Sequence, residues 1–92
     1  MAVELEWDEA KRLANVQKHG LDFAEVSSLD WDNATFLEDA RRKYSEPRFW
    51  AFAMKGPWLH VVTFCLRGAK VRVTSFRKAN DREVKRYGPK AT

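Results

Sequence analysis

The sequence predicts an α+β fold. An N-terminal strand and a helical hairpin pack on one face of an antiparallel sheet of about four strands, and a short helix follows the sheet. Residues 48–76 hold apolar runs separated by turn signals, which is typical of an antiparallel meander. Helix-capping residues open two segments before residue 30 and another at Asn80, with Glu83 three residues later. Ninety-two residues suffice for one modest core, so we expect a single domain over 1–92.

Apolar and acidic side chains alternate from Val3 to Trp7, which predicts a short strand. Asp8 is expected to cap a helix that ends at His19, because Gly20 can take the left-handed conformation that closes helices. The apolar side of this helix is expected to face the core: Ala10, Leu13, Ala14 and Val16.

A second helix is expected after this turn, because Asp22 and Glu25 have the spacing of a capping box. The two helices then form a hairpin. The expected buried residues of the second helix are Phe23, Val26 and Leu29. Residues 35–37 are a further predicted strand, and 39–47 read as a solvated loop.

Three more strands are expected, at 49–54, 58–66 and 70–76. The middle one is apolar on both faces, which predicts a central position in the sheet. In the last one, strict alternation turns Val71, Val73 and Ser75 to the core, and turns Lys70, Arg72 and Thr74 to a face that the helices leave open. By the same alternation Arg77 points away from Arg72, unless the chain turns after Phe76.

The distribution of charge indicates a polyanionic partner. Residues 1–40 carry a net charge of −7 and residues 41–92 one of +11, within a total of +4. A basic half of this kind favours nucleic acid as the partner. Alternatively, the two halves fold against each other and their charges are merely complementary.

Three features favour a cytoplasmic protein. Cys65 is the only cysteine, so no intrachain disulfide can form and a reducing compartment is expected. No apolar run approaches the roughly 20 residues that span a bilayer. The first residues are acidic and do not resemble a signal peptide.

Arg48, Arg72 and Arg77 are the strongest candidates for binding phosphate, because a guanidinium group forms bidentate hydrogen bonds with phosphate oxygens. Arg72 stands out, since it lies mid-strand between apolar residues. The alternative is a solvated strand face, which the sequence leaves equally open.

His19 is the candidate for proton transfer. At a helix C-terminus the partial negative charge is expected to favour its imidazolium form. RNA cleavage needs a 2′-hydroxyl deprotonated and a 5′-oxygen protonated, and a histidine suits both steps. Alternatively, His19 only bonds the last helical carbonyls. His60 is expected to be packed, and with Cys65 the two histidines lack metal-ligand spacing, so neither metal nor cofactor is expected.

Further side chains are candidates for the RNA backbone. Lys11, Asn15 and Lys18 share one helical stripe that a substrate could use, although such a stripe is more often solvated. The predicted backbone contacts are Lys18, Lys70, Lys78 and Arg82. The four tryptophans are expected mostly in core and sheet packing, although one exposed on the basic face could stack a base.

Several segments together resemble the BrnT family of toxins. The most specific is W-D-x-x-K with N-x-x-K-H-G. The matching residues are E-W-D-E-A-K (6–11), Asn15, K-H-G-L-D-F-A-E-V (18–26), Arg48, Phe49, V-V-T-F (61–64), R-V-T-S-F-R-K-A (72–79), Glu83 and Tyr87.

The resemblance implies the fold of RelE-like ribonucleases and a metal-independent endoribonuclease that inhibits translation. It implies a hetero-oligomer with a BrnA-like ribbon-helix-helix antitoxin. In that complex only the antitoxin is expected to bind operator DNA. It places the cationic motif on Lys18, His19, Arg48, Arg72 and Arg77. Ala53 stands where a glycine is common and Phe76 where the family usually has a small residue, so Phe76 is expected to narrow the site or to offer a stacking surface.

Two other functions stay open. Toxins of the RelE-like fold can poison DNA gyrase instead of cutting RNA, because a fold does not fix an activity. A non-catalytic module that only grips phosphates is the second alternative, and it predicts strongly salt-dependent binding without cleavage products.

Overall fold

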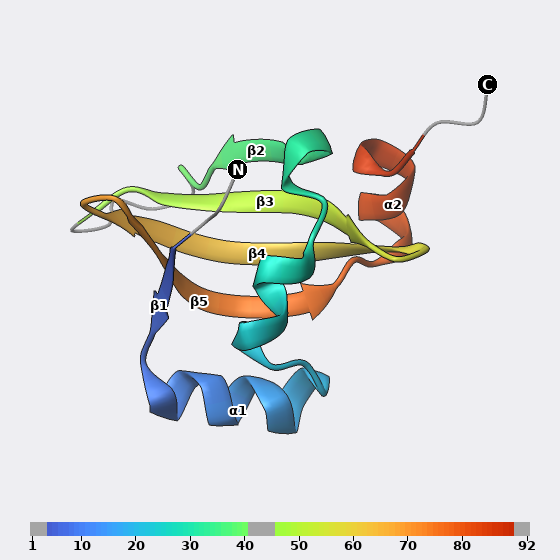
Figure 1. Cartoon of the computed structure of the whole chain (residues 1–92). Helices are drawn as coiled ribbons and strands as arrows, with labels where there is room; N and C mark the ends of the chain where they lie inside the picture. The colour runs from blue at the N-terminus through green and yellow to red at the C-terminus, as the bar shows by residue number, and fades with distance from the viewer. Residues whose placement is uncertain (1–3, 41–45, 90–92) are drawn as a thin grey trace.

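A computed structural model describes residues 4–40 and 46–89 of the chain (Figure 1). The sequence-predicted strand residue Val3 and most of the predicted loop 39–47 lie outside the described residues. The elements are, in order, strand β1 (Leu5–Trp7), helix α1 (Glu9–His19), 3₁₀ helices η1 (Phe23–Ser28) and η2 (Trp31–Asn33), strands β2 (Thr35–Glu38), β3 (Arg48–Lys55), β4 (Trp58–Arg67) and β5 (Lys70–Lys78), and helix α2 (Asp81–Tyr87).

The described strands form one mixed sheet of five strands in the order β1-β5-β4-β3-β2. β4 is central, as predicted. The prediction of an antiparallel sheet of about four strands is wrong in one respect, because β1 joins the sheet edge parallel to β5, with Glu6 opposite Arg72. The alternation in residues 5–7 predicts a strand, but three residues carry no signal for its partner or direction.

The hairpin also differs from the prediction. Asp8 caps α1 and Gly20 closes it with a φ of 71°, as expected. The second segment has the predicted capping box of Asp22 and Glu25 but forms a 3₁₀ helix rather than an α-helix. η1 lies across one face of the sheet, whereas α1 runs beside the edge of β5 (Figure 1).

A β-bulge in β5 decides which side chains face which side. Thr63 pairs with Ser75 and Phe64 with Val73, so Thr74 is the extra residue. Beyond it the alternation is reversed. Phe76, rather than the predicted Ser75, therefore turns to the same side as Val73, which we call the core face. Arg77 turns to the opposite side together with Arg72.

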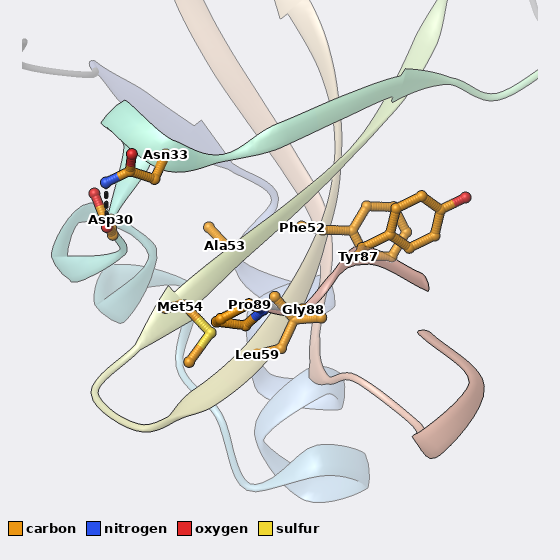
Figure 2. A pocket seen from close by; sticks show the side chains of 9 residues that line it. All are labelled: Asp30, Asn33, Phe52, Ala53, Met54, Leu59, Tyr87, Gly88 and Pro89. Atoms are coloured by element: carbon orange, nitrogen blue, oxygen red, sulfur yellow. Dashed lines mark hydrogen bonds between the residues drawn. The ribbon is translucent and has the colours of Figure 1, made fainter. Parts of the chain in front are cut away.

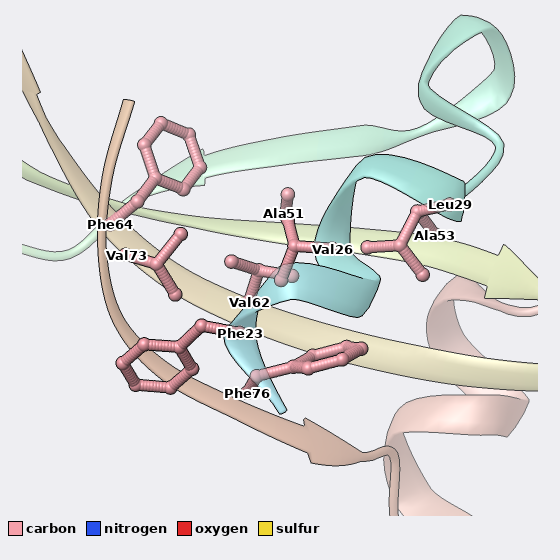
Figure 3. Packing of buried hydrophobic residues seen from close by; sticks show 9 residues of the cluster. All are labelled: Phe23, Val26, Leu29, Ala51, Ala53, Val62, Phe64, Val73 and Phe76. Carbon is pink, nitrogen blue, oxygen red and sulfur yellow. The ribbon is translucent and has the colours of Figure 1, made fainter. Parts of the chain in front are cut away.

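The main core lies between η1 and the core face (Figure 3). Phe23 and Val26 of η1 pack against Val62, Val73 and Phe76, and all five are 0% exposed. The predicted buried residues of the second helix, Leu29 included, are confirmed. Phe76 belongs to this core, so the expectation that it narrows or lines the site is wrong; Ala53, at 2% exposure, packs here too.

The prediction for α1 is wrong in its orientation. Its apolar residues Leu13 and Val16 are 52% and 37% exposed, and its buried residue is Asn15. The Asn15 amide donates to the carbonyl of Phe76 at 2.8 Å and accepts from the Phe76 amide at 3.1 Å. β1 pairs only with residues 71–73 of β5, so the backbone groups of Phe76 have no neighbouring strand on that edge. The side chain of Asn15 supplies their hydrogen-bond partners instead.

A smaller apolar cluster lies on the side opposite the core face, where Phe52, Leu59 and Val61 are buried. α2 docks here through Tyr87, whose ring stacks on Phe52 with centroids 4.1 Å apart. An adjacent hollow of about 380 Å³ is lined by residues that include Tyr87 and Met54. Figure 2 shows the side chains that line it. A second hollow, of about 360 Å³, lies on the core face and is lined by apolar side chains: Trp31, Phe36, Phe49, Phe64, Leu66 and Val71.

Candidate nucleic-acid interface

The side of the sheet opposite the core face carries three of the predicted arginines, and we call it the arginine face. Arg48 of β3 pairs with Cys65 of β4, which pairs with Arg72 of β5, so the three side chains share one row. Two strand spacings separate the backbones of Arg48 and Arg72, about 10 Å. Arg77 follows farther along β5, and the bulge brings it to the same face without the predicted turn after Phe76.

Carboxylates accompany the arginines of this first row. Arg72 Nη1 lies 3.4 Å from Glu6 Oε2 on the neighbouring strand β1. Glu46 accepts hydrogen bonds from Arg67 at 2.9 Å and from Cys65 Sγ at 3.5 Å. The bond from Arg67 is the main cause that lowers the pKa of Glu46, and the charge of Arg48 contributes.

Arg77 is held more tightly. Its Nη1 and Nη2 donate to the two carboxylate oxygens of Glu83 at 2.7 and 2.8 Å. This bond raises the pKa of Arg77 and lowers that of Glu83. Both groups are therefore charged throughout the neutral range.

A groove of about 260 Å³ lies between α1 and β5, beside the hydrogen bonds that join Asn15 to Phe76. It is lined by Lys11, Ala14, Asn15, Lys18 and His19 of α1 and by Thr74 and Ser75 of β5. The structure thus brings the predicted stripe on α1 to the strand that carries Arg72 and Arg77. The hydroxyl groups of Thr74 and Ser75 were not among the sequence-predicted site residues, because strict alternation does not reveal a bulge.

His19 titrates in the direction opposite to the prediction. Burial is the main cause that lowers its pKa below the ordinary value of 6.5, and the charges of Lys18 and Arg77 lower it further. With its pKa lowered below 6.5, His19 is mainly in the neutral form at pH 7.

The remaining predicted contacts do not gather at the groove. Lys70 lies on the arginine face at the far end of β5, with Nζ 3.7 Å from Glu4. Lys78 pairs with His60 on the core face and lies 3.6 Å above the ring of Trp58. Arg82 is exposed on α2.

Trp50, Trp58 and His60 do not line the groove beside α1. Trp58 is 56% exposed, but it lies with Lys78 on the core-face side. Trp50 lies on the arginine face opposite Thr63 and is half-buried. His60 is buried, as predicted, with Nδ1 2.9 Å from the carbonyl of Trp58. Within residues 4–40 and 46–89, no three His, Cys, Asp or Glu side chains are grouped so as to hold a metal ion.

Comparison with known proteins identifies a matching family. A family model described as "Ribonuclease toxin, BrnT, of type II toxin-antitoxin system" matches residues 7–83. No curated protein matches the chain. In the part of the chain that the structure describes, no helix has the length and apolar character needed to cross a membrane.

Proposed function

The chain belongs to the BrnT family of ribonuclease toxins of type II toxin-antitoxin systems, and on this premise we propose that it is a metal-independent endoribonuclease of the RelE-like fold that inhibits translation in the cytoplasm. One observation carries the site assignment. The bulge at Thr74 sets Arg72 and Arg77 on one face of β5, beside the groove that holds Lys18 and His19. This arrangement presents cations and a neutral imidazole to one polyanion.

The proposed reaction follows from these groups. Arg72 and Arg77 bind the scissile phosphate and stabilise the charge that grows on its oxygens. Neutral His19 accepts the proton of the 2′-hydroxyl, whose oxygen attacks phosphorus and forms a 2′,3′-cyclic phosphate. The bond between phosphorus and the 5′-oxygen breaks, and the leaving oxygen takes up a proton from water. The imidazolium of His19 then returns its proton to the solvent. Arg48, two strands from Arg72, holds the neighbouring backbone.

The outer contacts divide into two groups. Lys18 and Lys11 line the groove and bind the phosphates next to the scissile one. Lys70, Lys78 and Arg82 remain predictions as contacts with more distant parts of the RNA.

An antitoxin partner follows from membership in a type II toxin-antitoxin family. We propose that this partner is a BrnA-like ribbon-helix-helix protein, that it neutralises the toxin in a hetero-oligomer, and that operator DNA binds only through it. Covering a basic face favours an acidic or amphipathic segment in the antitoxin.

The experiment compares RNA cleavage by the wild type, Arg77→Ala and Lys55→Ala, each with EDTA. Lys55 is the matched control, because it is a cation paired with a carboxylate, Glu25, on another part of the sheet. We expect full cleavage by the wild type and by Lys55→Ala, and a fall of about 100-fold for Arg77→Ala. Loss of wild-type cleavage in EDTA would overturn metal independence, and unchanged cleavage by Arg77→Ala would remove Arg77 from the site.

Two parallel measurements address the alternative functions. Inhibition of gyrase in a plasmid-supercoiling assay, without RNA cleavage, would assign the chain to gyrase poisoning. Salt-dependent RNA binding without products would reduce it to a binding module.

A further inference from the structure

The bond between Glu83 and Arg77 joins the candidate site to α2. Both carboxylate oxygens of Glu83 are used, at 2.7 and 2.8 Å from Nη1 and Nη2. The Glu83 side chain is 17% exposed and that of Arg77 35%. An ion pair of two donors and two acceptors fixes the plane of a guanidinium group, which a single contact would leave free to rotate.

The geometry of the guanidinium group decides what this bond leaves available. Arginine has five N–H donors in a rigid plane. Among the described residues, the contacts of Arg77 use Nη1, toward Glu83 and the carbonyl of Lys78 at 3.4 Å, and one Nη2 hydrogen. The Nε hydrogen and the second Nη2 hydrogen form a separate edge of the same plane. That edge can donate two hydrogen bonds to a phosphate while the other edge stays bound to Glu83.

Glu83 is itself held in place by the start of α2. Its Oε1 accepts from the backbone amide of Asn80 at 2.9 Å, and the Asn80 side chain accepts from the Glu83 amide at 2.8 Å. The stacking of Tyr87 on Phe52 anchors the other end of the helix to the sheet. Glu83 therefore reaches Arg77 from a short helix that keeps two anchors, the Asn80 backbone amide and the Tyr87 ring, when the Asn80 side chain is removed.

We propose that Glu83 is a positioning residue, which holds the Arg77 guanidinium so that its Nε–Nη2 edge faces the RNA phosphate. The inference rests on the proposed function, because it requires Arg77 to bind phosphate. Glu83 does not touch the RNA; it acts through Arg77. The carboxylate is thus part of the site rather than a competitor for the arginine.

Two variants separate this role from helix capping. Glu83→Gln keeps the capping box, because glutamine fills this position as glutamate does, but it has one acceptor oxygen and cannot grip both Nη atoms. Asn80→Ala does the reverse, because it removes the side-chain cap and keeps the ion pair. Comparing them assigns any loss of activity either to Arg77 positioning or to α2 stability.

The measurement is kcat/KM for cleavage of a short RNA by the full chain, below the melting transition of every variant. We expect a fall of about tenfold for Glu83→Gln and a change of less than about twofold for Asn80→Ala. In an Arg77→Ala background, Glu83→Gln is expected to have no further effect, because a residue that acts through Arg77 has nothing left to position. This non-additivity is the signature that a purely structural role would not produce.

The outcomes distinguish this inference from the proposed function. Wild-type activity in Arg77→Ala would overturn the role of Arg77 and the inference with it. A large loss in Arg77→Ala with none in Glu83→Gln would overturn the inference alone, as would tighter RNA binding by Glu83→Gln, which would make Glu83 a competitor. Equal additional losses from Glu83→Gln in both backgrounds would also overturn it.

Discussion

The two sides of β5 carry different kinds of residue, although they belong to one strand. On the core face, Val73 and Phe76 are fully buried against η1. On the arginine face, Arg72 and Arg77 remain partly exposed, each beside a carboxylate. The bulge at Thr74 makes this division possible, because without it Phe76 and Arg77 would exchange sides. The comparison teaches that one strand can separate the residues that build the core from the residues that we propose bind RNA.

The largest expected effect is on the core face. Phe76→Ala removes a fully buried ring, so we expect the free energy of unfolding to fall by about 3–5 kcal/mol. Arg77→Ala removes a partly exposed ion pair and is expected to cost less than about 1 kcal/mol. Urea denaturation of both variants measures this difference. Equal losses would contradict the division of β5 into two functional sides.

The pH dependence of RNA cleavage tests whether His19 acts as the base beside the arginine face. Because its pKa lies below 6.5, the neutral base is the main form at pH 7, and it is lost as the pH falls through that pKa. We therefore expect kcat/KM to rise with pH through an inflection below 6.5 and to be level at neutral pH. His19→Gln is expected to lower kcat/KM about 100-fold and to remove the inflection. A pH profile unchanged in the variant would exclude His19 as the base.

Asn15 sharpens the comparison, because it joins α1 to β5 at Phe76, two residues after the bulge. Asn15→Ala leaves the buried amide and carbonyl of Phe76 without these partners, which we expect to destabilise the fold by about 1–3 kcal/mol. Asn33→Ala is the control, since its side chain makes an exposed bond to Asp30. In thermal unfolding, Asn15→Ala is expected to melt at a clearly lower temperature than Asn33→Ala. Equal melting temperatures would argue against Asn15 as the link between α1 and β5.

The smallest expected effect is at Leu13. A helix that packed by its apolar side would lose a few kcal/mol on Leu13→Gln. With Leu13 52% exposed, we expect a change within about 0.5 kcal/mol. Urea denaturation of Leu13→Gln distinguishes these two expectations. A loss of a few kcal/mol in the free energy of unfolding would mean that α1 packs by its apolar side after all.

Much of the fold can be predicted from local signals. The caps at Asp8, Asp22 and Asn80 and the central position of β4 each follow from a few neighbouring residues. The parallel pairing of β1 with β5 does not, because it joins segments more than sixty residues apart. The packing of α1 through Asn15 also escapes prediction, since hydrophobic periodicity favours the side with Leu13.

The candidate site was predictable by residue type but not by geometry. Arginine chemistry identifies Arg72 and Arg77, a histidine at the end of a predicted helix identifies His19, and the resemblance adds Lys18. Their common side depends on the bulge, for which strict alternation gives no signal. The pKa of His19 was predicted in the wrong direction, because the helix C-terminus is visible in the sequence, whereas the burial of His19 and the influence of Arg77 are not.

The central claim is that RNA binds the arginine face of β5 and the groove beside α1. Backbone amide NMR shifts during titration with a 2′-O-methyl RNA, which cannot supply the attacking hydroxyl, test it most directly. We predict that shifts concentrate at residues 72–77 and at Lys18 and His19, while Phe36 and Leu66 of the apolar hollow on the core face do not respond. Shifts confined to that hollow, with none on the arginine face, would contradict the account.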